Sequence, residues 1–216
     1  MSKVTLYSHD ISPPCRSVLL VAHVIDLPLN IHEINLTNHD QTKDEFVKIN
    51  PQRMIPAIDD NGFLLSDSHA IITYLVDKYA NNDDIYPKDI KKRALVNQHL
   101  FFDASVFFAT MKTALRPIFR EGVKSVSEKT MNEVKNAYAS LNTLLEGKKW
   151  LVGDSYTIAD ISCVVTATGG IALLNLDNYP NVKDWVQRCE AEIPGYQEIN
   201  MPGLNKLQEI LRSKLG

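Results

Sequence analysis

A serine stands where a short strand pattern gives way to a helix pattern, in the run Ser12-Pro13-Pro14-Cys15-Arg16. A group at such a helix start faces free N–H groups and the positive end of the dipole, so it can stabilise a thiolate. In the small redox α/β fold this position carries cysteine, with a second cysteine three residues on, and only the second is present here, as Cys15. The pattern indicates a thiol site whose thiol is supplied by a bound molecule, although Ser12 taken alone is also explained as an ordinary helix N-cap.

Two further segments offer partners for the rest of a small peptide. A cis bond between Ile55 and Pro56 would turn the backbone N–H and C=O of Ile55 outward, where an extended peptide could pair with them as an extra strand. Asp67 could accept from an ammonium group, and Ser68, with its N–H at a helix start, could bind a carboxylate. Three loops would then gather one thiol, one amine and one carboxylate at one edge of a sheet.

The first 80 residues supply the elements that must position these groups. Strands are predicted at 4–7, 29–32, 55–58 and 63–65, and helices at 13–25, 45–49 and 68–79. This β-α-β-α-β-β-α order predicts a parallel βαβ unit followed by an antiparallel hairpin and a helix, which together make a small α/β sandwich. Pro56 inside a strand pattern marks an edge or a bend.

The rest of the chain reads as helical. Residues 81–88 contain Asn-Asn-Asp-Asp and Pro87, a polar break suited to a linker. Helices are predicted at 93–119, interrupted at Pro117, and at 126–145, 185–193 and 204–215. Thr157 followed by Asp160 predicts a capping box at the start of a further apolar helix. We therefore expect an α/β domain over 1–80, a linker over 81–88 and an all-helical domain over 89–216.

Composition excludes several classes of function. The 26 acidic residues outnumber the 23 basic ones, for a net charge of −3, and no segment concentrates Lys and Arg as a nucleic-acid footprint would. Three distant cysteines, Cys15, Cys163 and Cys189, lack the spacing of a zinc site and read as buried small side chains, and the six histidines are unclustered. The longest uncharged run, 161–176, is too short to span a bilayer. We expect a cytoplasmic protein without metal, nucleic-acid partner or membrane insertion.

In the order and spacing of its motifs, the chain resembles the cytosolic glutathione transferases, specifically the insect delta and epsilon classes. The resemblance covers nearly the whole chain and rests on motifs that are each weak alone: Ser12-Pro13-Pro14-Cys15-Arg16, Asn50-Pro51-Gln52 with Ile55-Pro56, Asp67-Ser68-His69-Ala70-Ile71, Leu75-Val76-Asp77-Lys78-Tyr79, Tyr86-Pro87, Gly153-Asp154 and Thr157-Ile158-Ala159-Asp160. It implies a thioredoxin-like N-terminal domain, an all-α C-terminal domain and a homodimer. Glutathione would bind along the N-terminal domain, with an apolar substrate in the cleft between the domains.

The resemblance also implies a role for each matched residue. Ser12 would donate a hydrogen bond to the glutathione sulfur and favour its thiolate, remaining a neutral hydroxyl itself. Ile55, held by the adjacent Pro56, would pair through its backbone with the cysteinyl part of glutathione. Asp67 and Ser68 would hold the γ-glutamyl end.

Four positions depart from the family pattern. The family usually has histidine, near the glycyl carboxylate of glutathione, where this chain has Gln41 and Arg53. The fork of Arg53 would suit that carboxylate, and Gln41 could still donate a neutral hydrogen bond. Lys112 stands where arginine is frequent, and Arg116 where an acid is frequent. These changes bear on affinity and substrate range more than on the activity itself.

The apolar substrate site is expected along the fourth helix and the C-terminal segment, because these line the cleft in this family. The candidates are Ile11, Phe108, Met111, Lys112, Leu115, Phe119 and Leu204. An aromatic and methionine stripe at helical spacing is more often core than pocket, so we expect about half of these residues to line the pocket.

The sequence is compatible with three functions. The first is a detoxifying enzyme in which the glutathione thiolate attacks the carbon of a small hydrophobic electrophile, with an accompanying peroxidase activity on peroxide oxygens. The second is a carrier that binds a hydrophobic ligand such as a steroid without turnover. The third is a thiol–disulfide oxidoreductase with Cys15 as the nucleophile, which is disfavoured because Cys15 should point into the core between sheet and helix.

Overall fold

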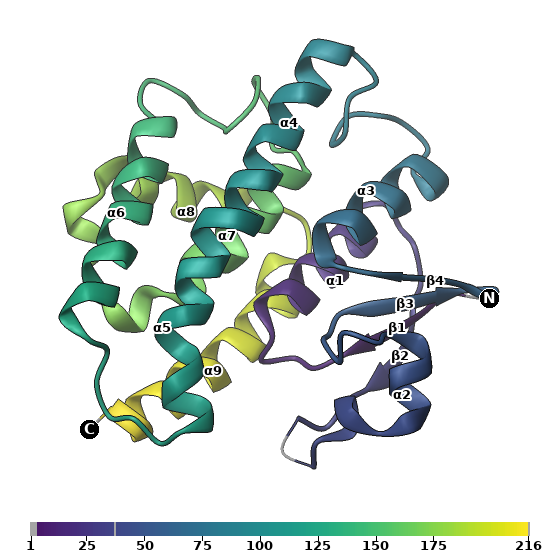
Figure 1. Cartoon of the computed structure of the whole chain (residues 1–216). Helices are drawn as coiled ribbons and strands as arrows, with labels where there is room; N and C mark the ends of the chain where they lie inside the picture. The colour runs from purple at the N-terminus through teal and green to yellow at the C-terminus, as the bar shows by residue number, and fades with distance from the viewer. Residues whose placement is uncertain (1–3, 37, 216) are drawn as a thin grey trace.

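The computed structural model describes residues 4–36 and 38–215. Figure 1 shows a small sheet with its helices on one side of the molecule and a bundle of longer helices on the other. The helix α9 (Met201–Leu215) begins beside α1 (Pro13–Val24) and runs along the bundle to the C-terminus, so the two parts of the chain meet beside the predicted thiol site (Figure 1).

The sheet has the predicted mixed topology. Its strands lie in the order β2-β1-β3-β4, with β1 parallel to β2 and β3 antiparallel to both β1 and β4. Ile58 lies opposite Leu6 on one side and Leu65 on the other, which fixes the register of the hairpin. The bounds are β1 (Val4–Ser8), β2 (Asn30–Glu33), β3 (Ala57–Asp60) and β4 (Phe63–Ser66).

Helices cover both faces of this sheet because successive strand residues point to opposite sides. Leu6 packs in the large core cluster with residues of α1 and α3 (Ser68–Tyr79), whereas its neighbour Tyr7 packs against Phe46 of α2 (Asp44–Ile49). Asp60, at the end of β3, accepts hydrogen bonds from the hydroxyls of Tyr74 and Tyr79 on α3, at 2.6 and 2.8 Å. The β3–β4 hairpin is therefore hydrogen-bonded to α3, the helix that begins at Asp67 and Ser68, where the amine and the carboxylate of a ligand are expected to bind.

The apolar pattern predicts a strand that includes Pro56, but in the structure Pro56 lies outside the strand. The Ile55–Pro56 bond is cis, as expected, and β3 begins only after it, at Ala57. The strand pattern was shifted because Ile55 and Pro56 are apolar and read as part of the same run. Ile55 is half-buried and is left outside the ladder.

The helical part is centred on α7 (Ile158–Gly169), every residue of which is buried. Its predicted capping box is confirmed: the N–H of Thr157 donates to Asp160 Oδ2 at 2.9 Å, and Thr157 Oγ1 accepts from the N–H of Ala159. Around it lie α4 (Ile90–Phe102), the π-helix η2 (Asp103–Phe107), α5 (Phe108–Arg120), α6 (Glu128–Leu144), α8 (Pro180–Glu192), the π-helix η5 (Tyr196–Asn200) and α9. Short 3-10 turns occur at η1 (Asp40–Thr42), η3 (Ile171–Leu173) and η4 (Leu176–Asn178).

The expectation that Pro117 interrupts a helix is wrong. The helix α5 continues through Pro117 to Arg120, and the break lies earlier, at η2. A proline this close to a helix end removes a single backbone hydrogen bond. The neighbouring Ile118 is fully buried in a cluster with Leu207 and Leu211 of α9, which compensates for that loss. The last two helices also begin earlier than predicted, at Pro180 and Met201 and not at Trp185 and Leu204.

Two predictions from composition concern the cysteines and membrane-spanning helices. The three cysteines are free, buried thiols, as expected. Within 4–36 and 38–215, no helix has both the length and the apolar character needed to cross a bilayer.

Candidate functional site

Ser12 occupies the end of the loop between β1 and α1. Its N–H donates to the carbonyl of His9 at 3.0 Å, and its own carbonyl accepts from the N–H groups of Cys15 and Arg16, each at 3.1 Å. These bonds place Ser12 as the residue before the first helical turn, in an extended conformation. Its side chain accepts no hydrogen bond from the N–H groups of that turn. The serine is therefore positioned like an N-cap without capping through its hydroxyl, which leaves the helix start able to receive an anion.

Cys15 is a poor nucleophile in this setting. It is fully buried, and burial raises the pKa of its thiol even though hydrogen bonding to Ser12 and to Ser8 opposes that shift. A protonated, inaccessible thiol cannot exchange disulfides. The geometry agrees with the expectation that Cys15 points into the core, and it disfavours the oxidoreductase.

The segment before the cis bond is shaped by Asn50. Its side-chain amide donates to the carbonyl of Met54 at 2.7 Å and accepts from the N–H of Gln52 at 3.0 Å. Arg53 stands in this turn with a φ of 58°, and its side chain is exposed. Neither backbone polar group of Ile55 is hydrogen-bonded to another residue in the described part of the chain. An extended ligand could therefore pair with Ile55.

Asp67 and Ser68 present a negative group and a free donor at the start of α3. The carboxylate of Asp67 caps the helix, accepting from the N–H groups of His69 and Ala70 at 2.9 and 3.3 Å, and its side chain is 63% exposed. Hydrogen bonding from His69 lowers the pKa of Asp67, so the group is anionic. Asp67 also has a φ of 74°, a strained backbone conformation of the sort that collects at ligand sites. Ser68 is buried, and its N–H has no partner among the described residues.

Sequence reasoning missed what stands behind Asp67. The ring of His69 lies between two carboxylates, with Nδ1 3.2 Å from Asp67 Oδ1 and Nε2 3.0 Å from Asp103 Oδ2. The hydroxyl of Ser162 on α7 donates to the same oxygen of Asp103 at 2.5 Å. Burial would lower the pKa of His69, but the hydrogen bonds to Asp103 and Asp67 outweigh it and raise the pKa to about 9. The imidazole is therefore a cation that joins the start of α3 to η2.

Gln41 and Arg53, the two residues expected near the glycyl carboxylate, differ in exposure. Gln41, in the turn η1, is 7% exposed, and its Oε1 has no hydrogen-bond partner within the described chain. Arg53 is exposed beside the segment that leads to Ile55. Both side chains can donate hydrogen bonds. Within the described residues Arg53 forms no ion pair with a carboxylate, and Gln41 is a neutral donor.

The predicted apolar site divides into two groups. Met111 and Leu204 are only 3% and 2% exposed, so in this structure they are packed interior residues and not the lining of an open pocket. Ile11, Phe108, Leu115 and Phe119 are half-buried, and Lys112 is exposed. Lys112 Nζ lies 3.7 Å from Met54 Sδ, next to Ile55. The face of α5 that carries Lys112 is thus turned toward the segment with the cis bond.

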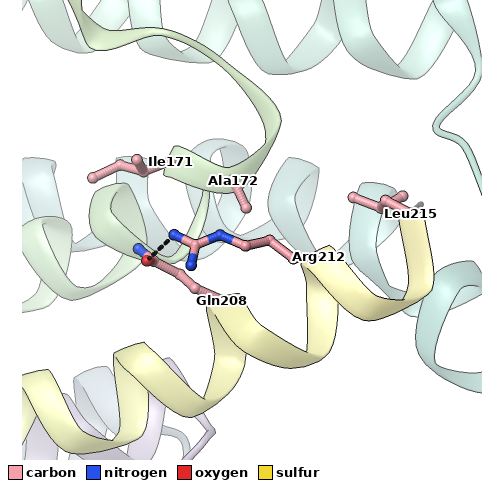
Figure 2. Close-up of a pocket in the computed structure, with 5 residues that line it drawn as sticks. All are labelled: Ile171, Ala172, Gln208, Arg212 and Leu215. Carbon is pink, nitrogen blue, oxygen red and sulfur yellow. Dashed lines mark hydrogen bonds between the residues drawn. The ribbon is translucent and has the colours of Figure 1, made fainter.

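A cavity of about 400 Å³ has a different lining, although two of its residues, Ala172 and Leu215, pack in one cluster with Leu115 and Phe119. It is lined by Ile171, Ala172, Gln208, Arg212 and Leu215, and Figure 2 shows Arg212 and Gln208 joined across one side of it by a hydrogen bond of 3.4 Å. No predicted site residue contributes to its lining. The residues described above, and not this cavity, form the candidate active site. Within the described chain no group of three or more His, Cys, Asp or Glu side chains is arranged to hold a metal ion.

Comparison with known proteins identifies the class to which this fold and site belong. Residues 6–83 match a family described as "Glutathione S-transferase, N-terminal domain", and residues 98–192 match "Glutathione S-transferase, C-terminal domain". The chain is 35% identical over 216 residues to Glutathione S-transferase 1 of Manduca sexta, covering 98% of this chain and 99% of the relative. The chain belongs to the glutathione S-transferase family.

Solved structures of two insect classes are similar to the whole chain. A delta-class glutathione transferase of Nilaparvata lugens has a TM-score of 0.93 and 35% identity, covering 98% of this chain and 99% of the other. An epsilon-class enzyme of the housefly Musca domestica also has a TM-score of 0.93, with 33% identity and 98% of each chain covered. These matches confirm the resemblance to the insect delta and epsilon classes, the predicted fold and the glutathione transferase activity. They support an enzyme and not the steroid carrier.

Proposed function

We propose that glutathione binds across the three loops that carry Ser12, Ile55 and Asp67, and that its thiolate attacks small hydrophobic electrophiles. The observation that carries this proposal is Ser12, which stands at a helix start while its side chain leaves the first-turn N–H groups uncapped. A sulfur bound there would meet a hydroxyl donor and the positive end of the α1 dipole, and both favour the thiolate.

The rest of the tripeptide is matched by groups of complementary kind. The unpaired backbone of Ile55, positioned by Pro56, would form a short ladder with the cysteinyl part. The exposed carboxylate of Asp67 would hold the γ-glutamyl ammonium, and the free N–H of Ser68 the α-carboxylate. Gln41 and Arg53 are proposed for the glycyl carboxylate, where Arg53 offers a full charge and Gln41 a neutral donor.

For the electrophile we propose the space between the Ser12 loop and α5. Half-buried Ile11, Phe108, Leu115 and Phe119 would supply apolar surface there, and exposed Lys112 would supply a charge at its edge. Met111 and Leu204 would support this surface from the interior. The enzyme then contributes proximity and a lowered thiol pKa, and Ser12 remains neutral throughout. A peroxide oxygen is a second target of the same thiolate.

We also propose a cytoplasmic homodimer that acts in detoxification, with residues 81–88 linking a domain over 1–80 to one over 89–216. Buried free thiols support a reducing compartment. The end of α3 at Tyr79 and the start of α4 at Ile90 support the linker.

Exposed apolar side chains on β4, α4 and η2 support the dimer. They are Phe63, Leu64, Leu95, Phe101 and Val106.

The pH dependence of conjugation tests the role of Ser12. Steady-state rates of glutathione addition to an activated aryl halide would be measured across pH for wild type and Ser12→Ala. We expect the variant to lose about 100-fold in rate near neutral pH, and its pH profile to move to higher pH, because the donor to the thiolate is gone. Ser140→Ala, an exposed serine on α6, is the control and should behave as wild type. An unshifted profile in Ser12→Ala would remove Ser12 from this role.

A further inference from the structure

Arg16 is an unusual residue to find in the interior. It lies in α1 one turn beyond Ser12, and its side chain is fully buried. Within residues 4–36 and 38–215 it forms no ion pair with a carboxylate, and its Nη2 has no hydrogen-bond partner. Burial lowers the pKa of Arg16 to about 10, so the group is still charged at neutral pH. Burying a cation without a counter-ion is costly, and an apolar side chain would pack there at less cost.

The hydrogen bonds that Arg16 does make join two distant parts of the chain. Its Nη1 donates to the carbonyl of Asp10 at 3.0 Å, in the loop that leads to Ser12. Its Nε donates to Asn200 Oδ1 at 2.8 Å, in the π-helix directly before α9. The guanidinium therefore bridges the loop and the start of the C-terminal helix. A lysine carries all its N–H donors on one terminal nitrogen, so it cannot place donors at the separate positions that Nε and Nη1 of Arg16 occupy.

The helix α9 touches the same carbonyl from its own side. A Cβ built on Gly203 would overlap the carbonyl oxygen of Asp10 and would lie 3.0 Å from Arg16 Cδ. Gly203 thus allows a close approach of α9 to the loop. One turn further along, Lys206 forms an ion pair with the side chain of Asp10 at the surface. Asp10 is held through its backbone from inside and through its carboxylate from outside.

We propose that Arg16 and Gly203 are positioning residues for Ser12: they fix the loop of Ser12 against α9, so that the C-terminal helix sets where the sulfur-binding hydroxyl lies. The loop is short and internally bonded, since the N–H of Ser12 donates to the carbonyl of His9, next to Asp10. A shift of the Asp10 carbonyl would therefore be passed on to Ser12. The inference rests on the proposed function, because it assumes that Ser12 stabilises the thiolate.

The substitution Gly203→Ala tests this without altering any charge or hydrogen-bonding group. The added methyl group must displace the Asp10 carbonyl. We expect the kcat of conjugation to fall about tenfold and the apparent pKa of the enzyme-bound thiol to rise by about one unit, equivalent to a tenfold loss of thiolate stabilisation. The KM for glutathione should change less than about twofold, because Ile55, Asp67 and Ser68 lie on other loops.

Gly169→Ala is the matched control. Gly169 is also buried and helical, and a Cβ there would meet Pro13 Cγ at 3.5 Å and Leu207 Cδ2 at 3.7 Å, which is ordinary van der Waals contact. It adds a methyl group close to the same helix start without displacing the loop, so kcat and the thiol pKa should be unchanged. Arg16→Lys is a second test variant, which keeps the charge and breaks the bridge, and it should shift the profile in the same direction as Gly203→Ala.

The proposal requires the shift in every test variant that folds. A folded Gly203→Ala or Arg16→Lys protein with lowered thermal stability but an unchanged pH profile would reduce Arg16 to a structural role and overturn the inference. Ser12→Ala separates this failure from that of the proposed function. If Ser12→Ala moves the profile and Gly203→Ala does not, only the inference fails, whereas the absence of conjugation by the wild-type chain would remove the proposed function itself.

Discussion

The charge on His69 is a property of its surroundings. The folded pKa is about 9, compared with 6.5 for an unperturbed histidine, because Asp103 and Asp67 bind the ring from two sides and outweigh the effect of burial. Since the folded value exceeds the unfolded one, the protonated imidazole stabilises the fold. That contribution is complete below pH 6.5 and is lost as the pH rises through 9.

This linkage gives a prediction for His69→Gln. The free energy of unfolding should fall by roughly 2–3 kcal/mol at pH 6.5, and the difference from wild type should shrink as the pH approaches 9. Denaturant titrations of both proteins at several pH values measure this, and the titrating groups that do not contact His69 cancel in the difference. His39→Asn, at an exposed histidine with a φ of 55° that asparagine tolerates, is the control. A gap between wild type and His69→Gln that stays constant with pH would contradict the prediction.

Individual residues also show which parts of the site could be predicted from the sequence and which could not. Some site features depend on local chemistry, so the adjacent residues are enough to predict them. They are the position of Ser12, the cis Ile55–Pro56 bond and the helix cap at Asp67. The contact between His69 and Asp103 joins positions 34 apart in the sequence, and it forms only where η2 turns Asp103 toward α3. No short-range pattern predicts that meeting. Met111 and Leu204 show the same limit, because helical spacing places an apolar residue on a face without saying what covers that face.

At the scale of elements, Asp160 joins three segments of the helical part. Its Oδ1 accepts from the N–H of Leu151 at 2.9 Å and from Trp185 Nε1 at 3.0 Å, and its Oδ2 accepts from the N–H and hydroxyl of Thr157 at 2.9 and 3.1 Å. The carboxylate is fully buried. It therefore fixes the start of α7 to the preceding loop and to α8.

Removing this carboxylate should destabilise the protein without changing the chemistry. We expect Asp160→Ala to lower the free energy of unfolding by about 3–5 kcal/mol, because several buried donors lose their acceptor. The KM for glutathione should stay at the wild-type value at temperatures where the variant is folded. Asp154→Ala, at an exposed acid in the same loop, should leave stability nearly unchanged. Calorimetry and steady-state kinetics on the same samples would decide it, and a raised KM in folded Asp160→Ala would show that the prediction is wrong.

Elements were predicted best where apolar periodicity and end signals agree, as at α1, α3 and α7. The capping box at Thr157 is such a signal, and so is the proline pair that opens α1. The break at η2 was missed because a π-helix keeps apolar side chains close to helical spacing while adding a residue to the turn. The starts of α8 and α9 were placed too late. Each first turn contains a proline, Pro180 or Pro202, and a proline reads as a break although the first helical turn tolerates it.

At the scale of the whole molecule, the exposed apolar side chains are the feature that a single chain leaves unexplained. Phe101 on α4 is 71% exposed, and Phe63 on β4 is 48% exposed. Large exposed aromatic side chains lose contact with water when a second copy covers them, which favours association. The proposed homodimer would bury them in its interface.

Phe101→Glu should therefore convert the dimer to a monomer. A buried charge without a partner opposes association, so we expect a halved mass by sedimentation or light scattering at micromolar protein concentration. Val123→Glu is the matched control, because Val123 is an exposed apolar residue beyond the end of α5 and outside the proposed interface. A wild-type protein that is monomeric at that concentration, or a Phe101→Glu protein that remains dimeric, would contradict this arrangement.

The bridge made by Arg16 also bears on when the site is completed during folding. Arg16 and Asn200 are 184 positions apart, so their hydrogen bond closes a loop that includes most of the chain. The entropic cost of closing a loop grows with its length, and it falls only after the intervening segments have folded and drawn the ends together. If Arg16 positions Ser12 as proposed, we expect the geometry of Ser12 to be set among the last events of folding, so that recovery of conjugation reports completion of the native state more faithfully than recovery of helix content.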